Sequence, residues 1–258
     1  MKPKHTQTRK MKNKRISMTA LTCSIGLALF GGSANAATIY LDDFSGLVST
    51  NLNGTAPDTR PGTETWTATN YVNAGSPGWR ANGSIAAESS GTVLRGAFLP
   101  FTPTTGNVYT YSLDMNTTSA TSWLAMGFTA GAGLTTDFYG ATTVPAPWLL
   151  DEGAGNTGTF LGTALAGSVG FAATNAQHSY AIVLDTTAAL WTATWFRDSV
   201  QIRTDTYTTN PTINYIGIYK HDDAAGTVDN LSLTVVPEPG AALLGGLGLL
   251  ALLRRRRN

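Results

Sequence analysis

The sequence has few of the residues on which common functional sites are built. It contains one cysteine, Cys23, and only 13% of its residues are charged. Between residues 37 and 235 there are six basic and fifteen acidic side chains, so this region carries a formal charge near −9. Because nucleic acids and anionic membranes bind to basic patches, this composition excludes both as partners of the central region. Cations, glycans and other proteins remain.

Motifs of common hydrolases are also missing. No Gly-x-Ser-x-Gly sequence, which would position a nucleophilic serine, is present. Jelly-roll glycosidases carry their carboxylates on alternate residues of one strand, as in Glu-x-Asp-x-x-Glu, and this pattern is absent too. Asp151 and Glu152 are adjacent, so on a strand they point to opposite faces. We therefore expect a protein that is not an enzyme; the alternative is a polysaccharide-active jelly-roll hydrolase or lyase.

The N-terminus has the features of a secretory signal peptide, expected to span residues 1–36. Seven lysines and arginines lie among the first 15 residues, and an apolar stretch follows at residues 18–30. Ala34 and Ala36 place small residues where signal peptidase requires them, so cleavage by the secretion machinery is expected between Ala36 and Ala37. Cys23 lies in the removed segment, so the exported domain has no disulfide and is stabilised by its own core.

The C-terminal residues 236–258 have three parts in a fixed order. The first is Val236-Pro237-Glu238-Pro239, whose prolines fix φ and remove backbone donors, so we expect an extended peptide that cannot continue a sheet. Residues 240–253 are apolar, and as a hydrophobic helix they would span about 21 Å of a hydrocarbon core of about 30 Å. A positive block follows, which we expect to stay on the cytoplasmic side; it consists of Arg254, Arg255, Arg256 and Arg257.

Together these parts resemble the PEP-CTERM sorting signal of bacterial envelope proteins. The resemblance covers residues 236–258 and implies an exosortase-like membrane protease as a partner. It also implies that the tail is a transient signal; a single-span tail anchor is the alternative. With the signal peptide, it implies export to the membrane, cell envelope or extracellular surface of a Gram-negative-type bacterium.

Residues 37–235 are expected to form one all-β domain. Runs of alternating polar and apolar residues are separated by turn residues, with no helical periodicity of useful length. The clearest runs are residues 108–115, 180–185 and 191–196, and Asp198-Ser199 predicts a tight hairpin after the last of them. Residues 131–168 are the least regular, so loops and edge elements are expected there. About thirteen short strands predict a two-sheet antiparallel jelly-roll β-sandwich.

The two ends of this domain resemble the first and last strands of laminin-G, concanavalin-like and carbohydrate-binding-module jelly rolls. The segments are Tyr40-Leu41-Asp42-Asp43-Phe44-Ser45 and Val228-Asp229-Asn230-Leu231-Ser232-Leu233, and in such folds these strands often pair. The resemblance implies a binding or adhesive role more often than catalysis. It makes extracellular glycans the expected ligands, at the cell surface or in an exopolysaccharide matrix.

Acidic residues supply a candidate metal site. If the first and last strands pair, Asp42 and Asp43 come close to Asp229, and Asp222 and Asp223 precede the last strand by a short loop. Calcium prefers such oxygen clusters, so structural calcium is a candidate cofactor and no other is expected. Solvated turn residues are the alternative, because no calcium loop of fixed spacing is present.

Two of the six tryptophans are candidates for glycan contact. Trp79 lies in a Gly-Pro loop and Trp148 follows Pro147, so both are candidate exposed platforms for a sugar ring. Burial is the alternative for each, because large aromatic side chains dominate the cores of β-sandwiches. The Thr-x-Thr pairs are scattered along the chain, so a flat ice-binding array is not indicated.

Overall fold

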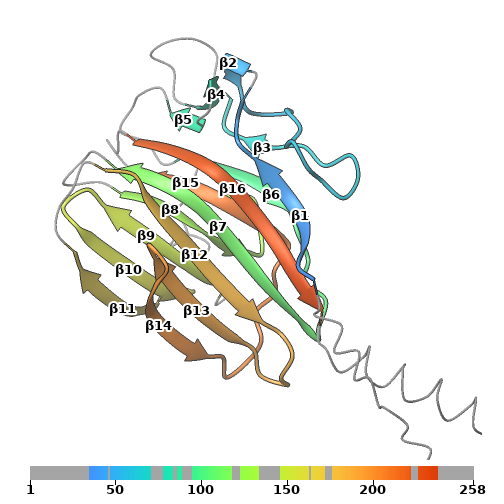
Figure 1. The fold of residues 1–258 in the computed structure, drawn as a ribbon, viewed down its shortest axis with the longest axis vertical. Helices are drawn as coiled ribbons and strands as arrows, with labels where there is room; N and C mark the ends of the chain where they lie inside the picture. Colours follow the sequence, from blue (N-terminus) through green and yellow to red (C-terminus); the bar gives the residue numbers. More distant parts are fainter. Residues whose placement is uncertain are drawn as a thin grey trace, which may run out of the picture. The chain divides into compact units, whose positions relative to one another are not determined.

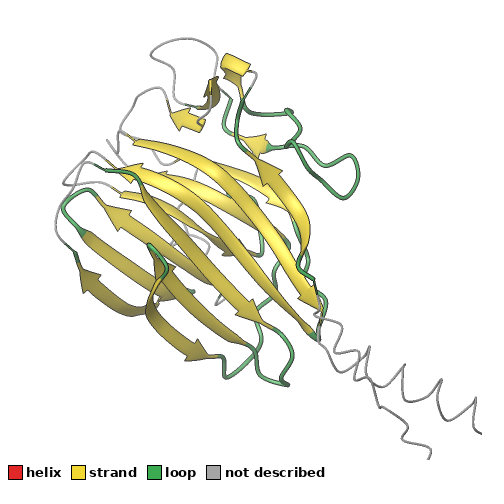
Figure 2. Ribbon diagram, viewed as in Figure 1, coloured by secondary structure: helices red, strands yellow, loops and turns green. Residues whose placement is uncertain are grey.

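Sixteen strands arranged in two sheets form the described part of this computed structural model (Figures 1 and 2). The structure describes residues 35–45, 47–70, 78–83, 86–88, 95–117, 123–133, 146–162, 164–171, 176–221 and 226–237. These residues contain no helix, and so none with the length and apolar character needed to span a bilayer. The two antiparallel sheets confirm the expected all-β sandwich.

The larger sheet has nine strands in the order β14-β13-β12-β7-β16-β5-β4-β2, and β1 also pairs with β16. Their bounds are β1 Ala37–Asp42, β2 Leu47–Asn51, β4 Trp79–Gly83, β5 Ala86–Glu88, β7 Asn107–Thr117, β12 His178–Asp185, β13 Thr192–Arg197, β14 Val200–Thr206 and β16 Gly226–Pro237. Burial alternates along β7 and β12, so each turns apolar residues toward the other sheet. The predicted hairpin joins β13 to β14, with positive φ at Asp198 and Ser199.

The smaller sheet has seven strands in the order β11-β10-β9-β8-β15-β6-β3. Their bounds are β3 Thr67–Ala68, β6 Arg95–Pro100, β8 Trp123–Thr129, β9 Pro147–Glu152, β10 Asn156–Leu161, β11 Ala164–Gly170 and β15 Tyr215–His221. The expectation of loops and edge elements over residues 131–168 is wrong for β9 and β10, which lie inside the sheet. Both of these strands are buried on both faces, so their sequences lack the alternation by which a strand is recognised.

The first and last strands are neighbours, as expected. β1 runs antiparallel to β16, with Ala37 opposite Val235 and Asp42 opposite Leu231. β1 therefore begins directly after Ala36, at the predicted cleavage point. Residues 1–34 of the predicted signal peptide, Ala34 among them, lie outside the described residues.

The last strand extends into the predicted sorting motif. Val236 and Pro237 lie opposite Val108 and Asn107 of β7, so the expectation that the motif stays out of the sheet is wrong for these two residues. Proline is tolerated at this position because the strand ends there and no further ladder bond is needed from its nitrogen. Glu238, Pro239, the apolar segment and the four arginines lie outside the described residues.

The main core fills the space between the two sheets. Trp66, Tyr111, Phe128, Trp195 and Ile218 are each less than 2% exposed and belong to one cluster drawn from both sheets. A second, smaller cluster contains Phe98, Trp123, Trp148, Phe160 and Tyr219. Its members alternate along β8 and β15 with residues of the main core, so they lie on the opposite face of the smaller sheet.

Glycines of the smaller sheet make room for these aromatic rings. A Cβ atom on Gly127 would lie 2.2 Å from Cβ of Trp148, and one on Gly217 would lie 2.4 Å from Cδ1 of Phe98. These distances are too short for any side chain. Glycine at these two positions therefore permits the second aromatic cluster to form.

Candidate functional site

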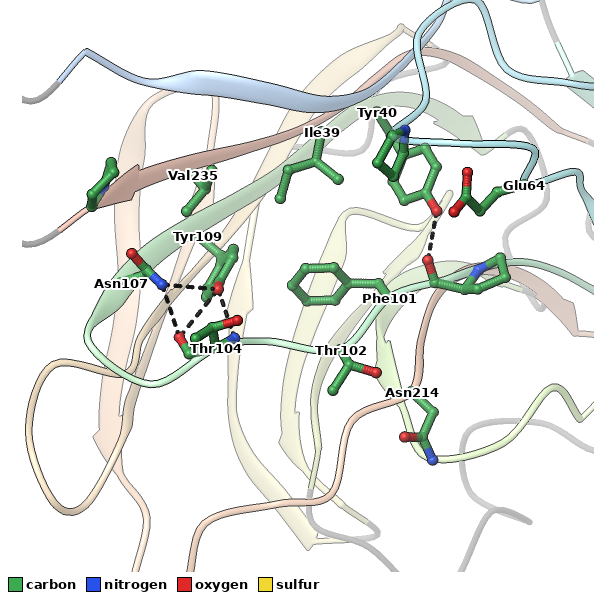
Figure 3. Close-up of a pocket in the computed structure, with 13 residues that line it drawn as sticks. Ile39, Tyr40, Glu64, Phe101, Thr102, Thr104, Asn107, Tyr109, Asn214 and Val235 are labelled. Carbon is green, nitrogen blue, oxygen red and sulfur yellow. Dashed lines mark hydrogen bonds between the residues drawn. The ribbon is translucent and has the colours of Figure 1, made fainter.

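A pocket of about 560 Å³ opens at the end of the larger sheet where β1 begins and β16 ends (Figure 3). Its size is within the range of about 300–1,000 Å³ that is usual for small-ligand sites. Its lining comes from β1, the loop before β3, the end of β6 and the segment after it, the start of β7, the residue before β15 and the end of β16. The residues are Ile39, Tyr40, Pro61, Glu64, Pro100, Phe101, Thr102, Thr104, Asn107, Tyr109, Asn214, Val235 and Pro237.

Phe101 and Tyr109 form an aromatic wall of the pocket. Their ring centroids are 5.1 Å apart and their planes meet at 72°, an edge-to-face arrangement. Ile39, Val235 and Pro237 add apolar surface from the paired end strands. The pocket therefore combines apolar walls with the polar groups described next.

The Tyr109 hydroxyl holds the segment between β6 and β7 in place. It accepts hydrogen bonds from the Thr104 backbone nitrogen at 2.7 Å and from Asn107 Nδ2 at 3.3 Å, and it donates to the Thr104 carbonyl at 3.1 Å. Asn107 Nδ2 also donates to that carbonyl, at 3.1 Å. Figure 3 shows this network at one side of the pocket. Both donors of the Asn107 amide are thus directed at the protein, and its carbonyl oxygen takes no part in these bonds.

Asn214 is held in a similar way on the opposite side. Its Nδ2 donates to the Ala130 carbonyl at 2.9 Å, and its backbone nitrogen donates to the Thr129 carbonyl at 2.9 Å. Its own carbonyl accepts from the Phe101 nitrogen at 2.8 Å. The side-chain oxygen of Asn214 is left out of these bonds, so it is a second acceptor at the pocket.

Among the described residues of the lining, Glu64 is the one carboxylate, and none is Lys, Arg or His. Its Oε2 atom is shielded from water and has no hydrogen-bond partner among the described residues. The Tyr40 hydroxyl beside it donates instead to the Pro100 carbonyl at 2.6 Å. Burial, and after it the Glu64 charge, raises the pKa of Tyr40 to about 12. Arg60 Nη1 donates to the Glu64 backbone carbonyl at 2.8 Å and forms no ion pair with the carboxylate.

The opposite end of β1 and β16 carries the acidic residues predicted as metal ligands. The Asp42 carboxylate accepts from the Phe44 backbone nitrogen at 2.9 Å and from Trp66 Nε1 at 2.6 Å. Burial raises the pKa of Asp42 to about 6, and these two hydrogen bonds oppose that rise. Asp42 is therefore a buried residue that fixes the turn after β1.

Asp43 and Asp229 are close enough for their charges to interact, as the strand pairing led us to expect. Burial raises the pKa of Asp229, and the charges of Asp114 and Asp43 add to this effect. Hydrogen bonds from Ser45 lower the pKa of Asp43. Asp114 accepts from Ser179, Gln177 and Asn230, so the carboxylates here are already hydrogen-bonded to protein donors.

No group of three or more His, Cys, Asp or Glu residues in the described part of the chain is arranged to hold a metal ion. Asp222 and Asp223 lie outside that part. The described carboxylates of this end, which we call the acidic corner (Asp42, Asp43, Asp114 and Asp229), all accept hydrogen bonds from protein donors.

Trp79 and Trp148 are not exposed platforms, and for both the expectation of an exposed ring is wrong. Trp79 is 0% exposed in the main core, and Trp148 is 1% exposed in the second cluster. Trp148 stacks on Phe160 with ring centroids 3.8 Å apart and donates from Nε1 to the Gly162 carbonyl at 2.7 Å. Proline and glycine residues directly before each tryptophan suggested a loop. In the structure, each tryptophan lies at the start of a buried strand.

The outer face of the larger sheet carries a row of threonines that runs across the strands. Strand register places one residue each from β14, β13, β12, β7, β16 and β1 side by side; they are Thr204, Thr194, Val183, Thr110, Thr234 and Thr38. The Thr194 and Thr204 hydroxyls are hydrogen-bonded at 2.9 Å. The threonines that are scattered along the sequence therefore meet in space, which no Thr-x-Thr pattern within one strand indicates.

The pocket residues were not predicted from the sequence. Glu64, Asn107 and Asn214 come from separate segments and share no motif. The one usable signal was local: Pro100-Phe101 and Pro103 mark an irregular connection between two strands, where binding residues often lie.

No family model matches the sequence, and no curated protein matches it. Among solved structures, an endo-1,3-beta-glucanase from Streptomyces sioyaensis is similar, with a TM-score of 0.50, 13% identity and coverage of 78% of this chain and 97% of that chain. The potassium-bound carbohydrate recognition domain of Emp46p has a TM-score of 0.48 and 12% identity, covering 67% of this chain and 88% of its own. The carbohydrate-binding module CBM66 from Bacillus subtilis has a TM-score of 0.41 and 13% identity, covering 65% and 94%.

The likeness to the glucanase shows a shared fold and nothing about activity, because the identity is only 13%. The chain thus has a jelly-roll β-sandwich fold.

Proposed function

We propose that this chain is an exported surface or matrix protein whose sandwich binds glycans, without catalysis, in the pocket at the end of β1 and β16. The observation that carries the proposal is the pocket itself: about 560 Å³, with an aromatic wall beside amide, hydroxyl and carboxylate oxygens. A sugar ring has an apolar face and a rim of hydroxyl groups. Ile39, Val235 and Pro237 present apolar surface that suits the face. Thr102, Asn107 and Asn214 suit the rim.

The lack of a second carboxylate in the lining supports a binding role. Glycoside hydrolysis uses two carboxyl groups, one as acid and one as base or nucleophile. Among the lining residues that the structure describes, Glu64 is the one carboxylate, so they supply only half of that pair. A glycan bound here is therefore expected to be held and not cleaved.

The positions of the two ends of the domain support export and sorting. Ala37 and Val235 are directly opposite each other, so the predicted signal-peptidase site and the predicted sorting motif leave the same end of one sheet. Processing by signal peptidase and by an exosortase-like protease would then act on neighbouring strand ends.

The pocket lies next to the start of the predicted apolar tail. Pro237 lines the pocket and is three residues before Gly240, a span of at most about 11 Å for an extended chain. While the tail is inserted in a bilayer, the pocket would stay close to the membrane surface. Removal of the tail would release the pocket to long glycans.

The glycan-binding part is tested with a glycan array probed by the full-length protein in mild detergent. A matched variant, Thr102→Trp, places a large ring at an exposed lining position without altering the core. We expect the wild-type protein to bind a defined set of glycans and the variant to lose that set. Binding that is the same for both proteins would contradict the proposed site.

The sorting part is tested separately by the intact mass of the protein from the envelope of a host that has exosortase. We expect a chain that starts at Ala37 and ends near residue 239. A mass that still includes Leu253 and the arginines would support the single-span anchor instead.

A further inference from the structure

β14 (Val200–Thr206) is the end strand of the larger sheet, and one of its two sides is open (Figure 1). β13 pairs with it on the other side, and no described strand lies beyond it. Four of its seven residues are exposed, and Val200, at 61%, is the most exposed large hydrophobic residue of the described chain. A strand with one neighbour presents a row of backbone N–H and C=O groups on its other side, and these can pair with a further strand.

The other described sheet edges are less suited to a strand partner. β2 has five residues and β3 has two, so each offers only a short edge. The free side of β1 already bonds to Thr59. β11 has seven residues, but its sequence Ala-Leu-Ala-Gly-Ser-Val-Gly has no charged side chain that would fix one register. β14 has the same length and carries one charge of each sign, at Arg203 and Asp205.

Arg203 and Asp205 lie on the same face of β14, because they are two residues apart. They form an ion pair, in which Arg203 Nη2 donates to Asp205 Oδ1 at 2.7 Å. Their register partners in β13, Trp195 and Ala193, belong to the main core, so this face is turned toward the smaller sheet. Inward-pointing charges often protect an open edge from association. Here the two charges cancel, so β14 as a whole does not repel a copy of itself.

We propose that β14 pairs with β14 of a second copy of this chain, antiparallel and about a two-fold axis through Thr204. In this register Arg203 of each copy lies opposite Asp205 of the other, so two reciprocal ion pairs form. An axis through Arg203 or through Asp205 would place like charges directly opposite each other, which is destabilising. The charges therefore favour the register about Thr204 over its two neighbours.

This pairing joins the larger sheets of two copies into one continuous sheet, and the same patch of each copy contacts the other. One pair of short strands is expected to bury less than the about 1,200–2,000 Å² of a standard interface, so the dimer is weak. The pocket end of β16 is separated from β14 by β13, β12 and β7. The inference is therefore independent of the proposed glycan site.

The first test is disulfide cross-linking of the full-length protein in detergent, with Cys23→Ser as the background. Thr204→Cys places two thiols opposite each other at the axis, with Cα atoms about 4.5–5.5 Å apart, which a disulfide can span. The control is Thr194→Cys, which lies one strand further from the axis in the same row. Its two thiols would be three strand spacings, or about 14 Å, apart, which is too far. Both variants lose the same hydrogen bond between the Thr194 and Thr204 hydroxyls, so they are matched.

Mild oxidation should give at least about fivefold more linked dimer from Thr204→Cys than from Thr194→Cys. Equal yields at the two positions would mean random collision, or association through the apolar tails, and would overturn the proposal. A Thr204→Cys variant that keeps the wild-type melting temperature and forms no linked dimer would overturn it too.

The second test examines the register through charge, in the Thr204→Cys background. Arg203→Asp places two carboxylates opposite each other across the axis, and Asp205→Arg places two guanidinium groups there. Each variant alone should give at least about fivefold less linked dimer, because like charges replace opposite ones. An equal mixture of the two variants should recover the yield, although neither chain has its own ion pair in β14. A mixture that is linked no better than the separate variants would overturn the register about Thr204.

Discussion

The two ends of β1 and β16 both carry carboxylates, but the protein uses them in opposite ways. At the acidic corner, Asp42 accepts from Phe44 and Trp66, and Asp114 accepts from three side chains. At the pocket, Glu64 has an oxygen that is shielded and has no partner among the described residues. The acidic corner holds more carboxylates than the pocket, but these carboxylates already accept hydrogen bonds from protein donors. The two ends therefore differ in whether their carboxylates have hydrogen-bond partners in the protein, as well as in how many carboxylates they hold.

The most direct test of this comparison places the same bulky side chain in the pocket and at the acidic corner. Thr102→Trp fills the pocket, and Ser45→Trp adds an equal ring at an exposed position of the acidic corner. We expect at least about a tenfold loss of glycan affinity for the first, because lost contacts of a ring and its hydroxyls exceed about 1.4 kcal/mol. Ser45→Trp should bind like the wild-type protein. Titration calorimetry checks both, and a loss of binding in Ser45→Trp alone would move the site to the corner.

A second prediction contrasts stability at the two ends. Trp66→Phe keeps most of the ring and removes the Nε1 donor, so it leaves the Asp42 carboxylate buried and short of one bond. We expect the free energy of unfolding to fall by about 2 kcal/mol, the usual cost of such a loss at a charged acceptor. Glu64→Gln should change it by less than about 0.5 kcal/mol, because it removes no bond of its carboxylate within the protein. Urea denaturation measures both, and equal losses would mean that Glu64 is also structural.

The third prediction concerns pH. The Asp42 pKa of about 6 in the folded state exceeds its ordinary value of 3.8, so the folded state binds this proton more tightly than the unfolded state. The resulting stability is fully present below pH about 4 and is lost as the pH rises through about 6. We therefore expect the melting temperature to fall by a few degrees, roughly 2–4 °C per kcal/mol, between pH 5 and pH 7.

Asp42→Asn is the control for that pH dependence. It should have a smaller slope of melting temperature against pH, whatever its absolute stability. Burial raises the pKa of Asp151 and Asp229 as well, so part of the slope should remain. The pKa of Asp43 is lowered, so its contribution to stability is lost only at more acidic pH, outside this range. A slope unchanged by the substitution would show that Asp42 is not the group responsible.

The smallest effect is expected from calcium. Because the described carboxylates of the acidic corner already accept protein donors, millimolar calcium should raise the melting temperature by less than about 1 °C relative to chelator. Differential scanning calorimetry of the full-length protein measures this. A clear rise with calcium concentration would instead mean that Asp43 and Asp229, with Asp222 and Asp223, hold an ion.

Much of the fold could be predicted because several strands alternate polar and apolar residues along the sequence. β7, β12 and β13 have one face in the core and one in solvent, so their period of two is visible in the sequence. β9 and β10 are covered on both faces, and this pattern disappears. The pairing of β1 with β16 was expected from a resemblance and not from alternation.

The pocket could not be predicted in the same way, because it depends on register and on distance in space. Glu64 and Asn214 are 150 positions apart and share a pocket only after both sheets have formed. The row across six strands, in which Val183 lies among five threonines, has the same origin, since it follows from strand pairing and not from any repeat. The predictions of exposed rings at Trp79 and Trp148 were wrong because the local sequence of each resembled a loop, whereas tertiary packing buries both side chains.

The most direct test of the account is a structure of the protein with a bound glycan. The account predicts a sugar ring in the pocket between Asn107 and Asn214. A sugar found instead at the acidic corner, or on the face of the smaller sheet beside Trp123 and Tyr219, would contradict it.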